Sequence, residues 1–537
     1  MRLVVLIANV ALALTIRPTP VSACGGFFCS TANPVLQSAE QIIFREHGDG
    51  TVTAIVQIQY AGPAERFAWV LPVPGAPDVG VSTNMLFQRL QGRTAPVYRL
   101  ATDGGTCLRT RGGVVTESSD GTGVTEAESP AVSVIDGGTV GPFDFVTIRV
   151  RPDVARPGDV AVEWLQENGY DVDDFGRERL SPYLAGGMNL IAFRLTKGRS
   201  EGSIRPIQLR YETDHPMIPI RPTAVAAAED MGVLVWVLGP SRAFPRNYRH
   251  LVLNEALINW LNPNANYNEV VSAAADEAGG HGFVTEMAGP TGELGPLLNS
   301  NESLEELRMR FVRNEGAAIR NLILNYQDWD GFRDALATVP LPAGTTVDDL
   351  LACSDCVELA DDIPDFELDD FLVTLDREVF GPIRDGEAFL REAPWITRLY
   401  TTLSASEMDV DPTFDFNADL PAVSNFHDAE RVVRCDRDRG IGSAPWRIRL
   451  STGQQIYGAG LDWPYQVGDL PAAQRIEQLQ AAGPPVVTAD RRDEIDAVLA
   501  TGLRAESLAG GGACSTSAGN HAWAALLFLV VVWRRRV

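Results

Sequence analysis

The first half of the chain takes its fold from the stretch Gln41-Ile-Ile-Phe-Arg-Glu-His-Gly-Asp-Gly-Thr-Val-Thr-Ala-Ile-Val-Gln-Ile-Gln-Tyr60. Its apolar start, which ends at Phe44, leads into the turn sequence His47-Gly-Asp-Gly50. Apolar and polar residues then alternate from Val56 onward, and a period of two places apolar side chains on one face of a strand. The stretch therefore predicts a β-hairpin.

Strand patterns continue up to residue 240. The run Phe67-Ala-Trp-Val-Leu-Pro-Val-Pro74 predicts a strand that ends where its prolines lack the N–H groups of a ladder. The segment 104–141 is rich in Gly, Ser, Thr and acidic residues, which predicts a long loop. Further strands are predicted at residues 143–150, 188–195, 207–211 and 232–239, and a short helix that Asp159 could cap is predicted between 152 and 168.

Helical spacing of apolar residues becomes frequent after residue 240. The clearest case begins at Ser303, because Ser303 and Glu306 have the spacing of a capping box. Helices are predicted at 249–261, 268–278, 303–326, 366–379, 388–403, 472–482 and 492–503, and short strands between 446 and 457. The chain is therefore predicted to be an α+β protein, with a β-rich domain at 24–240, a largely helical region at 241–430 and a mixed C-terminal region at 431–505.

The N-terminus has the pattern of a secretory signal peptide. Residues 3–16 are mostly apolar, but this run is too short to span a bilayer comfortably. Small residues up to Ala23 supply a cleavage site, which predicts a signal peptide at residues 1–23. The same residues also resemble a lipobox, which would instead attach a lipid to Cys24.

The last residues, 506–537, predict a linker and a sorting tail. Glycines and Cys514 precede an apolar run at 522–533 and arginines at 534–536. Twelve helical residues reach about 18 Å, against roughly 30 Å of hydrocarbon. This order of elements resembles the MYXO-CTERM sorting tails of myxobacterial surface proteins, and the resemblance implies cleavage by a sorting protease and a lipid on Cys514. The alternative is a short transmembrane anchor.

Both ends of the chain predict the same location. Under the positive-inside rule, the terminal arginines stay on the cytoplasmic side of the membrane and the body lies outside. An N-terminal signal peptide has the same consequence. The protein is therefore expected at the cell surface or outer envelope, attached to the membrane through its C-terminal tail or a lipid.

The composition is strongly acidic. The chain has 45 basic and 70 acidic side chains, which gives a net charge of −25. Such a field repels phosphate backbones, so nucleic-acid binding is excluded as a function class. Cations and basic partners suit this charge, although solubility alone would also explain it.

Seven cysteines suggest three disulfides and one thiol with another fate. Cys514 in the tail is the natural odd one. Acidic neighbours such as Asp355 disfavour a reactive thiolate in Cys353-Ser-Asp-Cys356, so a structural disulfide is favoured over a redox pair or half of a zinc site. Closeness in the sequence predicts the pairs Cys24–Cys29 and Cys353–Cys356, which leaves Cys107 with Cys435.

No P-loop, GxSxG, HExxH or dinucleotide-binding pattern occurs in the sequence. His281 is the best catalytic candidate, because it lies in a glycine-rich loop with Glu286 nearby. His215, with Asp214, is expected to fix a turn. No cofactor is predicted, although a calcium loop is an alternative reading of the oxygen ligands Asp409, Asp411, Asp415, Asn417 and Asp419.

Three stretches carry a family resemblance: Cys24-Gly-Gly-Phe-Phe-Cys29, the run at 67–74, and residues 206–248 with Arg-Tyr-Glu-Thr-Asp-His-Pro-Met and Trp-Val-Leu-Gly-Pro-Ser-Arg. They resemble the bacterial domain-of-unknown-function 2330 family, which has no assigned activity. The preferred hypothesis is a noncatalytic envelope protein that binds an unknown surface partner or has a structural role. The alternative is an exported, metal-assisted hydrolase that uses His281 and Glu286.

Overall fold

The computed structural model describes residues 29–509, with side chains from Glu40 to Thr501. Positions without a description inside this range are 31–32, 35–36, 58–67, 105–131, 152, 171, 173–175, 196–203, 226, 298–302 and 434–443. The predicted signal peptide and the tail with Cys514 lie outside the described residues. None of the described helices is both long enough and apolar enough to cross a bilayer.

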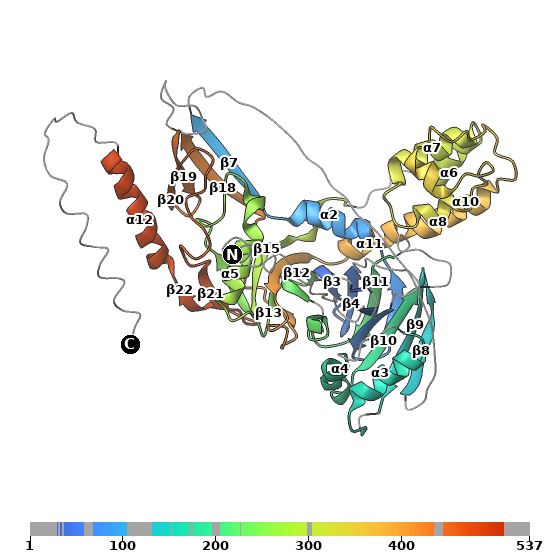
Figure 1. The fold of residues 1–537 in the computed structure, drawn as a ribbon, viewed down its shortest axis with the longest axis horizontal. Coiled ribbons are helices and arrows are strands. Elements are labelled where there is room, and N and C mark those ends of the chain that lie inside the picture. The colour runs from blue at the N-terminus through green and yellow to red at the C-terminus, as the bar shows by residue number, and fades with distance from the viewer. Residues whose placement is uncertain are drawn as a thin grey trace, which may run out of the picture.

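A ten-stranded sheet forms the centre of the molecule (Figure 1). The predicted hairpin is confirmed within it, since Gln41 lies opposite Gln57 in an antiparallel pair. Gly48 and Gly50 have positive φ angles of 72° and 81° in the turn, which glycine adopts without strain. In spatial order the strands are β22 (Val486–Asp490), β21 (Ala473–Gln478), β14 (Arg249–Leu253), β15 (Gly282–Pro290), β16 (Trp395–Leu403), β12 (Ala227–Gly239), β3 (Gln37–Glu46), β4 (Thr51–Gln57), β11 (Ile207–Glu212) and β6 (Asp78–Val81).

The middle of this sheet is buried on both faces. Ile43 and Ile55 belong to the apolar core on one face, whereas Ile42, Phe44 and Ala54 belong to the core on the other face. Successive residues of a strand point to opposite faces, which explains why the apolar run is continuous here.

A four-stranded sheet packs against one face of the central sheet. The rings of Trp69 and Phe193, with centroids 5.5 Å apart, belong to the core between the two sheets. Helices α3 (Pro157–Glu167) and α4 (Gly176–Ala185) cover the outer face of this smaller sheet (Figure 1). Its strands are, in order, β5 (Ala68–Val73), β10 (Asn189–Leu195), β9 (Phe143–Val150) and β8 (Val132–Val140).

A helical lobe, residues 304–380, lies beside the sheets (Figure 1). Helices α2 (Asn84–Thr94) and α11 (Gly381–Arg391) lie between the lobe and the central sheet. The predicted capping box is confirmed, because Ser303 and Glu306 bond each other's backbone N–H groups. The lobe contains α6 (Leu304–Phe311), α7 (Glu315–Tyr326), α8 (Phe332–Leu336), α9 (Val347–Ala352), α10 (Leu368–Leu375) and the π-helical turn η6 (Asp376–Phe380).

The opposite end of the central sheet carries a second four-stranded sheet and two helices (Figure 1). The core here includes Trp260, Trp446 and Ile495. The elements at this end are β20 (Gln455–Ala459), β19 (Pro445–Leu450), β18 (Phe426–Val433), β7 (Val97–Gly104), α5 (Tyr267–Asp276) and α12 (Arg492–Ala509).

Two short strand pairs are separate from the larger sheets. They are β1 (Cys29–Ser30) with β2 (Asn33–Pro34), and β13 (Ala243–Pro245) with β17 (Phe414–Phe416).

The α+β class is confirmed, but several predicted helices are wrong. Residues 249–253 form β14, 395–403 form β16 and 473–478 form β21. These strands are mostly buried in the central sheet, where apolar spacing does not distinguish a strand from a helix. The region 241–430 is therefore mixed, with strands on both sides of the helical lobe. The predicted cap is also wrong: Arg156 is the N-cap residue of α3, and Asp159 lies in its first turn.

Candidate functional site

A cavity of about 290 Å³ lies between the central sheet and the smaller sheet of the sandwich. We call it the sandwich cavity. Ten of its sixteen lining residues are apolar. Strand β3 contributes Glu40, Ile42 and Phe44, which point to the same face because they are every second residue of the strand. Strand β4 contributes Ala54 and Val56.

The smaller sheet and the segment that follows β11 form the rest of the wall. Leu71 and Pro72 of β5 line the cavity, together with Met188 just before β10. Met217 and Thr413 also line it and pair with each other in an isolated β-bridge. Side chains from distant parts of the chain therefore converge on one space.

The sandwich cavity runs from the surface into the core. Pro74 and Asp214 among its lining residues are exposed. At the other extreme, Ile42 and Phe44 are only 2% and 1% exposed. The cavity therefore has a mouth at the surface and a floor in the core between the two sheets.

Glu40 is the unusual member of the lining. It occupies a core position on the same face of β3 as Ile42, and it is 9% exposed. The side chain of Thr223, in the short 3₁₀ helix η3 (Thr223–Val225), hydrogen-bonds the Glu40 carboxyl group. The Oε2 atom of Glu40 has no hydrogen-bond partner among the described residues.

Burial determines the protonation of this carboxyl group. Removal from water raises the pKa of Glu40 from 4.5 to about 7, and the hydrogen bond from Thr223 offsets only part of this rise. Burial likewise raises the pKa of Tyr211, another lining residue. The charged lining residues include Glu40 and Asp214 but no arginine or lysine, so the cavity is acidic.

The predicted catalytic residues His281 and Glu286 have separate partners. His281 is partly exposed, and its Nε2 lies 2.8 Å from Oδ1 of Asp409. Its ring also packs edge-on against Tyr248, with centroids 4.9 Å apart. No metal-holding group of three or more His, Cys, Asp or Glu side chains occurs among the residues for which the structure gives side chains.

Glu286 belongs to a buried ion pair instead. It lies at a β-bulge between Thr285 and Met287, and such a bulge redirects a side chain. Its carboxylate accepts hydrogen bonds from Nε of Arg398 and, at 2.5 Å, from the hydroxyl of Tyr267. Burial, followed by the charge of Glu286, raises the pKa of Tyr267 well above its ordinary value. This arrangement stabilises the centre of the sheet and leaves Glu286 no free oxygen for His281.

The proposed calcium ligands also bind protein groups. The carboxylate of Asp411 accepts a hydrogen bond of 2.6 Å from Tyr183 and one of 2.9 Å from the backbone of Ile220. Asp409 contacts His281. The remaining three also have partners: Asp415 accepts from the backbone of Phe416, Asn417 donates to backbone carbonyls of Gln480 and Gly483, and Asp419 accepts from the backbone of Gly483. These contacts tie loops together and give the calcium hypothesis no support.

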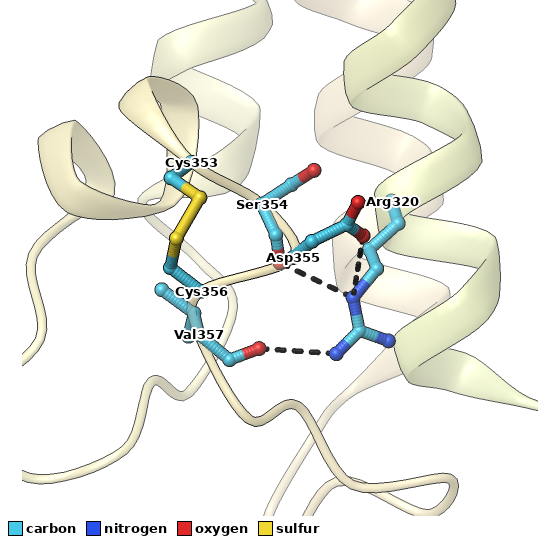
Figure 2. The surroundings of a disulfide bond; sticks show 6 residues. All are labelled: Arg320, Cys353, Ser354, Asp355, Cys356 and Val357. Carbon is cyan, nitrogen blue, oxygen red and sulfur yellow. Dashed lines mark hydrogen bonds and ion pairs between the residues drawn. A yellow bond between two sulfur atoms is a disulfide. The ribbon is translucent and has the colours of Figure 1, made fainter.

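One predicted disulfide is confirmed: Cys353 and Cys356 are bonded at the end of α9 (Figure 2). Figure 2 shows Arg320 of α7 on the side of the 353–357 loop away from the bridge, where it donates hydrogen bonds of 3.2 Å and 3.0 Å to the carbonyls of Ser354 and Val357. With both sulfur atoms in the bridge, this pair offers no thiolate to a zinc ion. The predicted partners Cys24, Cys107 and Cys435 lie outside the described residues, as does the side chain of Cys29.

Sequence reasoning missed the sandwich cavity and Glu40. The missed pattern is a charged residue two positions before Ile42 and four before Phe44, which places it on the same face of the strand as these two core residues. Asp214 and His215, which were predicted to fix a turn, lie in a bend of the chain and also line the cavity. Two of the stretches that carry the family resemblance, 67–74 and 206–248, form much of its wall.

No curated protein and no solved structure is similar enough to the chain to count as a match. A family profile described as an uncharacterized protein conserved in bacteria (DUF2330) matches residues 18–313, which include every lining residue of the sandwich cavity except Thr413. Because this match covers more than half of the chain, the protein belongs to the DUF2330 family.

Proposed function

We propose that this protein is a noncatalytic binding protein of the cell envelope that holds a small apolar ligand in the sandwich cavity. The observation that carries the proposal is a cavity of about 290 Å³ that reaches from exposed Pro74 to fully buried Phe44. Protein cores are normally close-packed, with few voids larger than a water molecule. A space of this size is near the lower end of small-molecule sites.

The walls favour an apolar ligand. Ten of the sixteen lining residues are apolar, and burial of apolar surface contributes about 25 cal/mol per Å². The cavity lies between two hydrogen-bonded sheets, so its shape exists before the ligand enters. Little conformational entropy is then lost on binding.

Noncatalytic binding fits the separate contacts of the hydrolase candidates. Glu286 is paired with Arg398, while His281 contacts Asp409. Neither residue lines the sandwich cavity. The hydrolase hypothesis would need a reacting group close to His281 other than Glu286.

Envelope attachment is part of the proposal. Its support is the N-terminal signal pattern at 1–23, the sorting-like tail with Cys514, and the Cys353–Cys356 disulfide, which is typical of an oxidising compartment. We expect a sorting protease to cut near Cys514 and a lipid to be attached there. Mass spectrometry of surface-localised protein tests this, and a peptide that ends at Val537 would contradict it.

Binding of the neutral fluorophore N-phenyl-1-naphthylamine tests the proposed function. We expect saturable binding at one site in the full chain and at least a tenfold loss in Met188→Trp, because Met188 lines the cavity and the larger indole takes up part of its space. Met309→Trp is the matched control, since Met309 is 51% exposed on α6 and does not line the cavity. Absence of saturable binding, or an equal loss in both variants, would overturn the proposal.

A further inference from the structure

The proposed apolar binding leaves one feature of the sandwich cavity unexplained, namely its buried acid. We infer that the ligand is an apolar primary amine, and that its ammonium group binds the carboxylate of Glu40. This inference rests on the proposed binding function of the cavity. It adds the chemical class of the ligand and the residue that recognises it.

The hydrogen-bonding capacity of Glu40 is only partly used. An ionised carboxylate accepts up to about four hydrogen bonds. Thr223 bonds the Glu40 carboxyl, while Oε2 is buried from solvent and has no partner among the described residues. A buried charge without partners is costly, and the cost falls when a donor of opposite charge is supplied. An ammonium group carries three donors and a positive charge, so it meets both needs.

The charge of the lining selects a cation. Glu40 and Asp214 are both acidic, and no arginine or lysine lines the cavity. The influences on the Glu40 carboxyl are burial and the bond with Thr223, with no guanidinium among them. The cation that pairs with Glu40 must therefore come from the ligand. A fatty acid with the same apolar chain as the amine would bring a second carboxylate to Glu40 and be repelled.

The position of Glu40 also explains why the ligand needs an apolar body. Glu40, Ile42 and Phe44 stand on one face of β3, so a ligand bound at Glu40 lies along the two apolar side chains. Leu71 of the smaller sheet and Met188, just before β10, line the cavity opposite them. A small hydrophilic amine would leave these walls without contact and lose the hydrophobic contribution.

Proton linkage provides an independent signature. Burial raises the pKa of Glu40 to about 7, and a bound ammonium group lowers it again, so amine binding releases protons near neutral pH. Amine affinity should therefore increase between pH 5.5 and pH 8, where alkylamines stay protonated. The other titratable groups that face the cavity are Tyr211, Asp214 and His215, so the pH profile is compared with that of His215→Gln.

Calorimetric titration of the full chain with octan-1-amine, octan-1-ol and octanoate at pH 8 tests the inference. We expect the amine to bind at least tenfold more tightly than the alcohol, as a charge-assisted hydrogen bond implies, and octanoate to bind weakest. Glu40→Gln should remove the preference for the amine and leave alcohol binding within about threefold. Glu46→Gln is the matched control, because it removes the same charge from the same strand outside the cavity lining.

The outcomes separate the two proposals. If the alcohol and N-phenyl-1-naphthylamine bind but the amine is not preferred, the inference fails and the proposed function stands. The inference also fails if Glu40→Gln and Glu46→Gln weaken amine binding equally. If none of the probes binds, both proposals fail. The comparison of amine with alcohol on the wild-type chain requires no variant, so it remains decisive if Glu40→Gln does not fold.

Discussion

At the residue scale, a single acid departs from the pattern that otherwise forms the sandwich. Every other described cavity-facing position of β3 and β4 is apolar, whereas Glu40 places a carboxyl group among them. Glu286 is a second buried acid, but each of its oxygens has a partner, Tyr267 for one and Arg398 for the other. The two acids therefore have different roles: Glu286 stabilises the sheet, and Glu40 is left to interact with a ligand.

The burial of Glu40 predicts a pH-dependent stability. Its folded pKa of about 7 exceeds the ordinary 4.5, so between these pH values the folded protein binds more protons than the unfolded chain. The free energy of unfolding must then fall as pH rises through this window, by roughly 3 kcal/mol in total. Glu40→Gln should remove this fall. The unfolding free energy of the variant relative to that of the wild type should therefore rise by roughly 3 kcal/mol from pH 4 to pH 8. Urea unfolding of both proteins at both pH values measures this rise, and the same difference between the two proteins at pH 4 and at pH 8 would contradict the assignment.

The ion pair of Glu286 predicts a large structural effect. Glu286→Ala leaves the guanidinium of Arg398 buried without its carboxylate, which should cost about 3–5 kcal/mol of unfolding free energy. His281→Ala should cost less than about 1 kcal/mol, because Asp409, the partner of His281, is 63% exposed. Urea denaturation compares the two variants. A larger loss of unfolding free energy in His281→Ala than in Glu286→Ala would contradict this ranking of the two contacts.

At the scale of elements, local patterns predicted strands with short apolar runs between turn signals and a helix with a capping box. The hairpin β3–β4 and the strands β5, β9, β10, β11 and β12 were predicted. The helix predicted at 303–326 begins as expected with the cap at Ser303, but it is two helices, because α6 ends at Phe311 and Asn314 caps a second helix, α7. Strands β14, β16 and β21 were predicted as helices, because the spacing of apolar residues in these segments fits a helix as well as a strand. The β-branched and aromatic content of Trp395–Leu403 was the available signal for β16.

The disulfide at the end of α9 predicts a local effect. It closes a loop of only four residues, for which the chain-entropy relation gives about 2 kcal/mol. The double variant Cys353→Ser/Cys356→Ser should therefore weaken the helical lobe and speed its proteolysis. Binding of N-phenyl-1-naphthylamine in the sandwich cavity should stay unchanged, because no lobe residue lines that cavity. Loss of dye binding without faster cleavage in the lobe would contradict this separation.

At the scale of the whole molecule, pairing of distant segments determines the architecture. The central sheet joins strands from residues 37 to 490, so its order followed from no local pattern. The sandwich cavity has the same origin, because Glu40, Met188 and Thr413 meet only through the tertiary fold. Sequence reasoning recognised the family from stretches of the cavity wall but had no means of placing them around one space.

The parallel pair β7–β18 supports the predicted Cys107–Cys435 disulfide. Its register places Gly104 opposite Val433. The two strands are parallel, so both end at the same edge of the sheet, shortly before Cys107 and Cys435 in the sequence. Neighbouring strands are roughly 4.8 Å apart, within reach of a disulfide. Non-reducing peptide mapping should recover a peptide that joins these two cysteines. Recovery of Cys107 alkylated in the unreduced protein would contradict the pairing.

The central claim is that the sandwich cavity binds an apolar amine. A crystal structure of the protein with 8-bromooctan-1-amine tests it most directly, because the anomalous signal of bromine marks the apolar end of the ligand. We predict one bromine peak among the apolar walls of the cavity, with the amine nitrogen within hydrogen-bonding distance of the Glu40 carboxylate. An unoccupied cavity at saturating ligand, or bromine bound only elsewhere on the protein, would contradict the account.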